Sequence, residues 1–63
     1  MKLIGANKLS AIMYILFFYD RKTREYAECV VTNISGVKYL ADKVPVMTYE
    51  EFDELQKPTK ARI

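Results

Sequence analysis

The chain offers few side chains that could perform chemistry, and Cys29 is the first to weigh. A cysteine becomes a nucleophile when a nearby base removes its proton, and histidine is the usual base. The 63 residues include one cysteine and no histidine. Because Cys29 alternates with Ala27 and Val31, the pattern favours a small side chain that points into the core. The same counts rule out an intrachain disulfide and argue against a zinc or haem site.

Four carboxylates form a second candidate group: Glu50, Glu51, Asp53 and Glu54. Such a group could serve acid–base catalysis or hold a cation. Their spacing places them on a short helix, where solvated and capping roles are favoured. The chain has only two glycines, so it lacks a glycine-rich phosphate loop. The sequence therefore predicts a protein that is not an enzyme and takes no metal, cofactor or small-molecule substrate.

A third group is basic, with an aromatic ring beside it: Arg21, Lys22, Arg24 and Tyr19. Its cations could contact phosphates while the tyrosine stacks on bases. Two carboxylates, Asp20 and Glu25, flank the cluster and weaken its field. The net charge is only +2, from 10 Lys and Arg against 8 Asp and Glu. Nucleic-acid binding is therefore the alternative function rather than the favoured one.

The element that positions these groups is an apolar run over residues 11–19, rich in β-branched and aromatic side chains. Those residue types predict a strand. Asp20 opens a polar connection in which its side chain can accept a backbone N–H two residues on. Residues 24–32 read as a second strand, so the sequence predicts a hairpin 11–19/24–32 with Tyr19 opposite Arg24.

That register divides the side chains of the hairpin between two faces. One face would carry Ile12, Tyr14, Leu16, Ala27, Cys29 and Val31. The other would carry Met13, Ile15, Phe17, Tyr19, Tyr26, Glu28 and Val30. A slip of one residue would exchange the faces. The first strand is apolar on both sides, which is typical of a strand covered by a layer on each face.

The clearest local signal is a capping box, in which Thr48 and Glu51 each accept the backbone N–H of the other. It predicts a helix over residues 49–57, too short to persist alone, so it must dock on the sheet. Residues 58–63 read as a flexible tail. Residues 1–10 are either a loose arm or an edge strand.

The segment between hairpin and helix is harder to interpret. Residues 37–40 and 44–47 read as one or two short strands, with Pro45 requiring a place at an edge. A short helix over 39–43 is the competing interpretation. In total the sequence predicts one small α+β domain over residues 1–63: a small antiparallel sheet with one C-terminal helix.

A single short helix can cover one sheet face but not two, so an apolar face is expected to meet another polypeptide. The expected contact patch is Met13, Ile15, Phe17, Tyr26 and Val30, or the equivalent opposite face if the register shifts. We expect a homo-oligomer, most simply a dimer, and/or a complex with a larger protein that it binds or regulates, as small accessory proteins of phages and mobile elements do. The apolar run is too short for a membrane span, which favours a cytoplasmic location.

Overall fold

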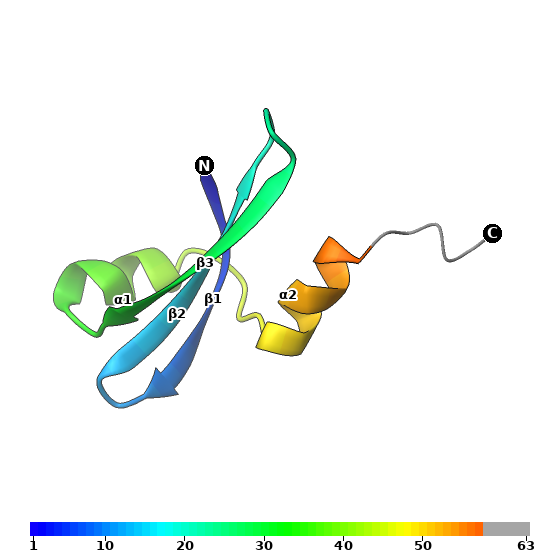
Figure 1. Cartoon of the computed structure of the whole chain (residues 1–63). Helices are drawn as coiled ribbons and strands as arrows, with labels where there is room; N and C mark the ends of the chain where they lie inside the picture. The colour runs from blue at the N-terminus through cyan, green and yellow to red at the C-terminus, as the bar shows by residue number, and fades with distance from the viewer. Residues whose placement is uncertain (58–63) are drawn as a thin grey trace.

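The structure is a computed structural model that describes residues 1–57, and the predicted tail at 58–63 lies outside them. The apolar run forms β2 (Met13–Asp20), the central strand of a three-stranded antiparallel sheet. Its neighbours are β1 (Lys2–Ser10) and β3 (Glu25–Thr32), as Figure 1 shows. The predicted small α+β fold and its hairpin are confirmed, and residues 2–10 form an edge strand rather than an arm.

β2 begins two residues later than the strand predicted from residue 11. Ser10 of β1 pairs with Met13 of β2, which leaves Ala11 and Ile12 as a two-residue turn between the two strands. Asn33 at the end of β3 secures this turn. Its backbone N–H donates to the Ile12 carbonyl at 2.7 Å, and its side-chain amide donates to the Ala11 carbonyl at 3.1 Å.

The tip between β2 and β3 differs from the predicted register by two residues. Tyr19 lies opposite Tyr26 rather than Arg24, and Asp20 lies opposite Glu25. The Asp20 carboxylate accepts the Lys22 N–H at 3.0 Å, as its position in the turn predicts, and its carbonyl accepts the Arg24 N–H at 2.7 Å. Arg24 adopts a left-handed backbone conformation with φ 60° to close the loop. Because the shift is even, both predicted faces are preserved.

The two strands predicted at 37–40 and 44–47 are absent from the fold. Residues Ser35–Ala41 form a helix, α1, and Val46 makes only an isolated parallel bridge with Ala6. The competing prediction of a short helix was nearer, although α1 begins four residues before 39. The sequence signal for the start of α1 is weak, because Ile34 at its N-cap supplies no side-chain hydrogen bond.

The C-terminal helix, α2 (Tyr49–Gln56), is confirmed and ends one residue earlier than predicted. Both halves of the capping box are present: the Thr48 hydroxyl accepts the Glu51 N–H at 3.0 Å, and the Glu51 carboxylate accepts the Thr48 N–H at 2.8 Å. Phe52 is the one buried residue of α2. It is only 1% exposed, so docking depends on this side chain.

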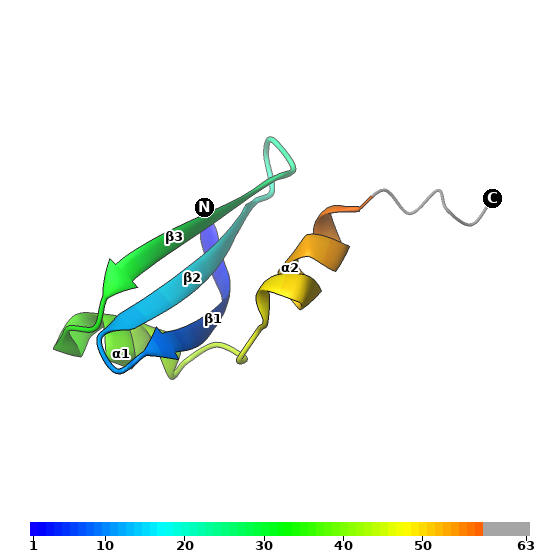
Figure 2. The same cartoon turned by 60° about the horizontal axis from the view of Figure 1, so that its bottom comes forward.

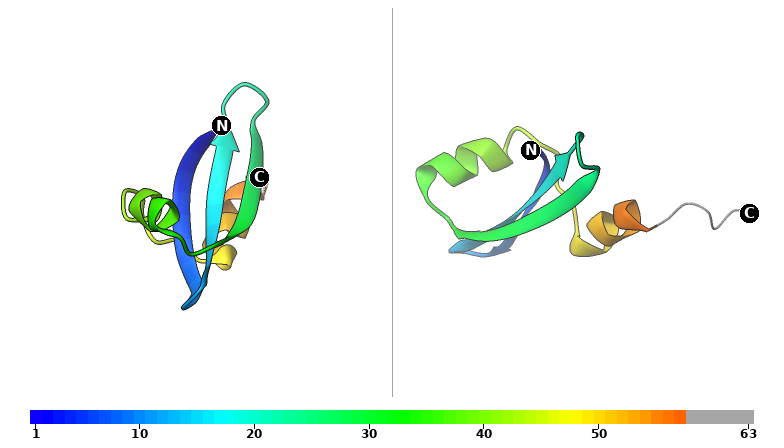
Figure 3. Two further views of the ribbon diagram at one scale, coloured as in Figure 1. Left: turned by 90° about the vertical axis from the view of Figure 1, so that its left-hand side faces the viewer. Right: turned by 45° about the horizontal axis from the view of Figure 1, so that its top comes forward.

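The two helices lie on opposite faces of the sheet, as Figure 2 and the two views of Figure 3 show. The chain passes from α1 to α2 around the outer edge of β1, where Met47 lies against Gly5. The Ala6 N–H donates to the Pro45 carbonyl at 3.2 Å, and the Met47 N–H donates to the Ala6 carbonyl at 3.0 Å. This bridge places Pro45 at a sheet edge, where its missing N–H costs nothing.

Candidate interaction surface

The predicted contact patch is divided by α2. Ile15 and Phe17 are 6% and 0% exposed and form the core cluster with Phe52. Tyr26 packs against the same cluster, with its ring 5.7 Å from that of Phe52 in an edge-on arrangement. These three predicted contact residues are thus wholly or partly occupied within the chain. The predicted helix was enough to cover this part of the face.

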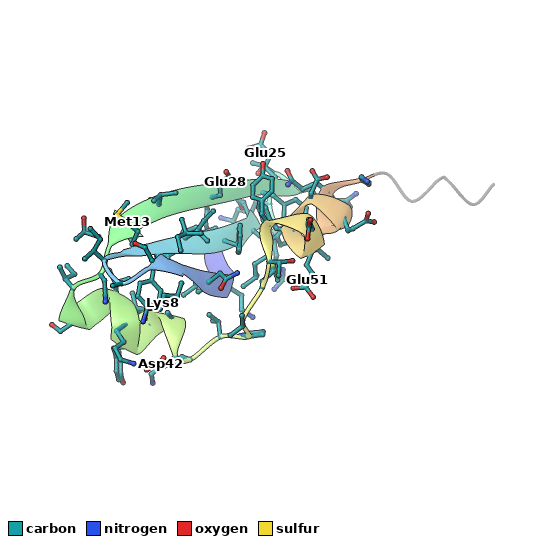
Figure 4. All side chains as sticks on the ribbon, turned by 90° about the horizontal axis from the view of Figure 1, so that it is seen from below. Lys8, Met13, Glu25, Glu28, Asp42 and Glu51 are labelled. Carbon is teal, nitrogen blue, oxygen red and sulfur yellow. The ribbon has the colours of Figure 1, made fainter. Side chains whose placement is uncertain are left out.

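Met13 and Val30 lie beyond the reach of α2 on the same face. Val30 pairs with the buried Ile15 yet remains 50% exposed, and Met13 is half-buried. Figure 4 shows Met13 at the end of the sheet opposite to α2. Of the five predicted contact residues, these two keep substantial surface available to a partner.

On the second face, α1 covers the part beside β1, although the sequence favoured strands over a helix in this segment. Tyr14 and Leu16 are 8% and 6% exposed there, and Val37 and Ala41 of α1 are half-buried. A hollow of about 190 Å³ separates the helix from β1 and is lined by residues that include Lys8, Tyr14 and Asp42. Figure 4 shows Lys8 and Asp42 on this side of the sheet.

One signal could have located α1 from the sequence. Lys38 forms an ion pair with Asp42 at 3.2 Å, and the Lys43 ammonium lies 4.5 Å from the centre of the Tyr39 ring. Both pairs have the i, i+4 spacing that is typical of neighbours on a helix surface. The alternation of apolar residues in this short segment favoured strands instead.

Cys29 is exposed, so its interpretation as a buried side chain is wrong. It lies on the α1 face opposite Leu16, but on β3, the strand farthest from β1. The helix packs beside β1 and leaves the β3 side of this face open. Alternation along the strands can therefore predict an apolar face of which a helix covers only a part.

Many large apolar side chains lie on the surface. Among residues 1–57, six residues make up the buried core: Ala6, Tyr14, Ile15, Leu16, Phe17 and Phe52. In the same part of the chain, ten large hydrophobic residues are exposed: Met1, Leu9, Ile12, Val30, Ile34, Tyr39, Leu40, Val46, Tyr49 and Leu55. Single exposed apolar residues are ordinary, whereas exposed apolar side chains that lie together are typical of interaction sites.

The basic tip is solvent-exposed at Arg21, Lys22 and Arg24. Tyr19 is half-buried and packs on Tyr26, with ring centroids 4.7 Å apart, so one part of its ring is already occupied. The pairing of β1 adds a cation that the sequence analysis missed. Lys2 lies opposite Tyr19 and lines an open hollow of about 430 Å³ together with Tyr19, Arg21 and Lys22.

The four residues of the predicted acidic group are all exposed on α2, and Glu51 serves there as part of the capping box. Among residues 1–57, no three His, Cys, Asp or Glu side chains are grouped so that they could hold a metal ion. No helix within these residues is long and apolar enough to cross a membrane.

Comparison with known proteins adds no relative. No family model matches the chain, and neither a curated protein nor a solved structure gives a significant match.

Proposed function

We propose that this chain is a non-enzymatic protein-interaction module that associates with itself and acts by binding a larger protein. The observation that carries the proposal is the excess of exposed over buried large apolar side chains. Exposed apolar surface of this kind is typical of interaction sites on small domains. Val30, at the accessible end of the predicted patch, is one of these exposed side chains, and the half-buried Met13 lies on the same face of the sheet.

The test is the mass in solution, measured by light scattering over a range of concentrations. A monomer has a mass of 7.4 kDa, and we expect a larger species. Val30→Lys places a charge on a half-exposed position and should shift the mass toward the monomer while the circular dichroism spectrum is retained. Thr23→Lys, at the exposed hairpin tip, is the matched control and should change nothing. A monomer at every concentration would overturn self-association.

The second candidate function is nucleic-acid binding by the hairpin tip. The observation that favours it is the hollow that Lys2 shares with Arg21 and Lys22, which gathers three cations beside a tyrosine ring. Asp20 lines the same hollow and weakens the attraction for phosphates.

A gel shift with mixed DNA and RNA over a salt series tests this candidate. The slope of log affinity against log salt is negative, and neutralising one phosphate-contacting cation should reduce its magnitude by about 0.7–0.9. Arg21→Gln is the test variant, and Lys57→Gln, which removes the same charge from the far end of α2, is the control. Equal effects of both variants, or no shifted band, would contradict a tip-specific site.

A further inference from the structure

The two edges of the sheet are treated differently by the fold. β1 has register shifts between Leu3 and Gly5 and between Lys8 and Ser10, and the bridge from Val46 covers part of its outer side. β3 pairs with β2 along its whole length without a shift. Among residues 1–57, no strand pairs with the outer side of β3, which forms the end of the sheet in Figure 3. Its outward N–H and C=O groups are therefore free to pair with another strand.

β3 also lacks most of the features that normally protect an edge strand. Proline, lysine and bulges are the usual protection, and β3 contains none of them. Its only charged residues are Glu25 and Glu28. Val30, Val31 and Thr32 are β-branched, which suits a paired strand. An eight-residue edge of this composition is suited to addition of a further strand.

We propose that β3 pairs antiparallel with β3 of a second copy, about a two-fold axis, so that one sheet continues across the dimer. This inference rests on the self-association proposed above and adds its location and register. A two-fold axis perpendicular to the sheet makes the same edge serve both copies, as a closed dimer requires. The second copy is the occupant because the edge is complementary to itself in one register.

The register follows from the side chains. Residues opposite one another must lie on the same face of the sheet. The two-fold axis must therefore lie level with one residue, which then faces its own copy, rather than level with the midpoint between two residues. The two longest overlaps place the axis at Glu28 or at Cys29. An axis at Glu28 would set that carboxylate directly opposite its copy, and like charges in this position are destabilising.

An axis at Cys29 avoids that opposition. It pairs Ala27 with Val31, Glu28 with Val30, and Tyr26 with Thr32 of the second copy. The two Glu28 side chains become diagonal neighbours about 7–8 Å apart, a distance at which salt screening weakens the repulsion. Cys29, exposed and the only cysteine, lies opposite itself.

This placement gives a direct test by crosslinking. Opposed Cα atoms in antiparallel strands are about 4.5–5.5 Å apart, within the range of about 4.4–6.8 Å that a disulfide spans. Oxidation of two Cys29 thiols to one disulfide releases two protons to the buffer and transfers two electrons to added copper–phenanthroline. The control is Thr23→Cys in a Cys29→Ser background, which moves the single thiol to the exposed tip. We expect the native chain to crosslink at least about tenfold faster, since pairing raises the local thiol concentration.

A mixing experiment then tests the register. Ala27→Cys and Val31→Cys are each made in the Cys29→Ser background. Either variant by itself should crosslink slowly, because in a dimer of one variant the two new cysteines are offset by four residues along the paired strands. Mixed in equal amounts, with a tag on one variant, they should give the mixed disulfide rapidly. An axis at Glu28 would instead pair position 27 with position 29 and leave the mixture slow.

The outcomes separate the two proposals. Rapid crosslinking at Cys29 together with the fast mixed pair supports the β3 interface. A dimer by light scattering whose Cys29 crosslinks no faster than the tip control overturns the β3 interface and leaves self-association standing. A monomer by light scattering that crosslinks at the control rate overturns both.

Discussion

The rings of Phe17 and Phe52 stack with centroids 4.3 Å apart and an angle of 28° between their planes. Both side chains are shielded from solvent, at 0% and 1% exposure. One comes from the central strand and the other from the last helix, so the pair joins α2 to the sheet. Stacked aromatic pairs contribute about 0.5–1.5 kcal/mol beyond the burial of their area.

Phe52→Ala is expected to release α2 from the sheet. Removal of a buried phenylalanine costs about 3–5 kcal/mol, which is comparable to the whole stability of a small domain. Urea unfolding followed by circular dichroism measures the loss. Leu55→Ala, at a position that is 47% exposed on the same helix, is the control and should shift stability by about 0.5 kcal/mol at most. Equal losses for the two variants would show that α2 does not dock through Phe52.

The two glycines are expected to respond in opposite directions to alanine. A Cβ on Gly5 would lie 2.8 Å from the Cβ of Met47, so the segment around Met47 that runs along the outer edge of β1 must shift. Overpacking of this kind costs about 1–3 kcal/mol. A Cβ on Gly36 meets nothing within 4 Å, and alanine in helix α1 should add about 0.5–1 kcal/mol. Thermal melting of both variants decides the point, and a stabilised Gly5→Ala would contradict the close crossing.

The capping box gives a prediction for a single hydroxyl. Thr48→Ala removes the acceptor of the Glu51 N–H and should cost about 0.5–2 kcal/mol. Thr23→Ala removes a hydroxyl from the exposed tip and is the matched control. Denaturant midpoints report the difference. If the two substitutions cost the same, the cap does not contribute to the stability of α2.

The sequence predicted the elements whose signals are local. The capping box depends on residues three apart, and the two faces of the hairpin depend on strict alternation, so both are confirmed although the register moved by two residues. An even shift leaves each side chain on its face, and for that reason the error in Tyr19 pairing did not propagate. The start of α1 has no side-chain cap, so local signals could not place it.

What covers each face could not be predicted, because coverage depends on where the helices dock. Pattern alone placed Cys29 in the core and Ile15 and Phe17 on a contact surface. The structure reverses both: α1 packs beside β1 and leaves Cys29 exposed, while α2 buries Ile15 and Phe17. Surface that sequence reasoning assigned to a partner is thus partly internal, and an edge it did not consider is open.

Asn33 gives the last prediction, since it ties the end of β3 to the turn between β1 and β2. Asn33→Ala removes the side-chain bond to the Ala11 carbonyl and should cost about 0.5–1.5 kcal/mol. The backbone bond from Asn33 to Ile12 remains, so the fold should stay intact. Without the side-chain bond the turn should open more often, and hydrogen exchange at the Asn33 amide should quicken without global unfolding. Asn7→Ala is the control, because the Asn7 side chain accepts the N–H of the adjacent Lys8 and so ties no distant segment within residues 1–57. Unchanged exchange at Asn33 would mean that the backbone bond alone holds the turn against β3.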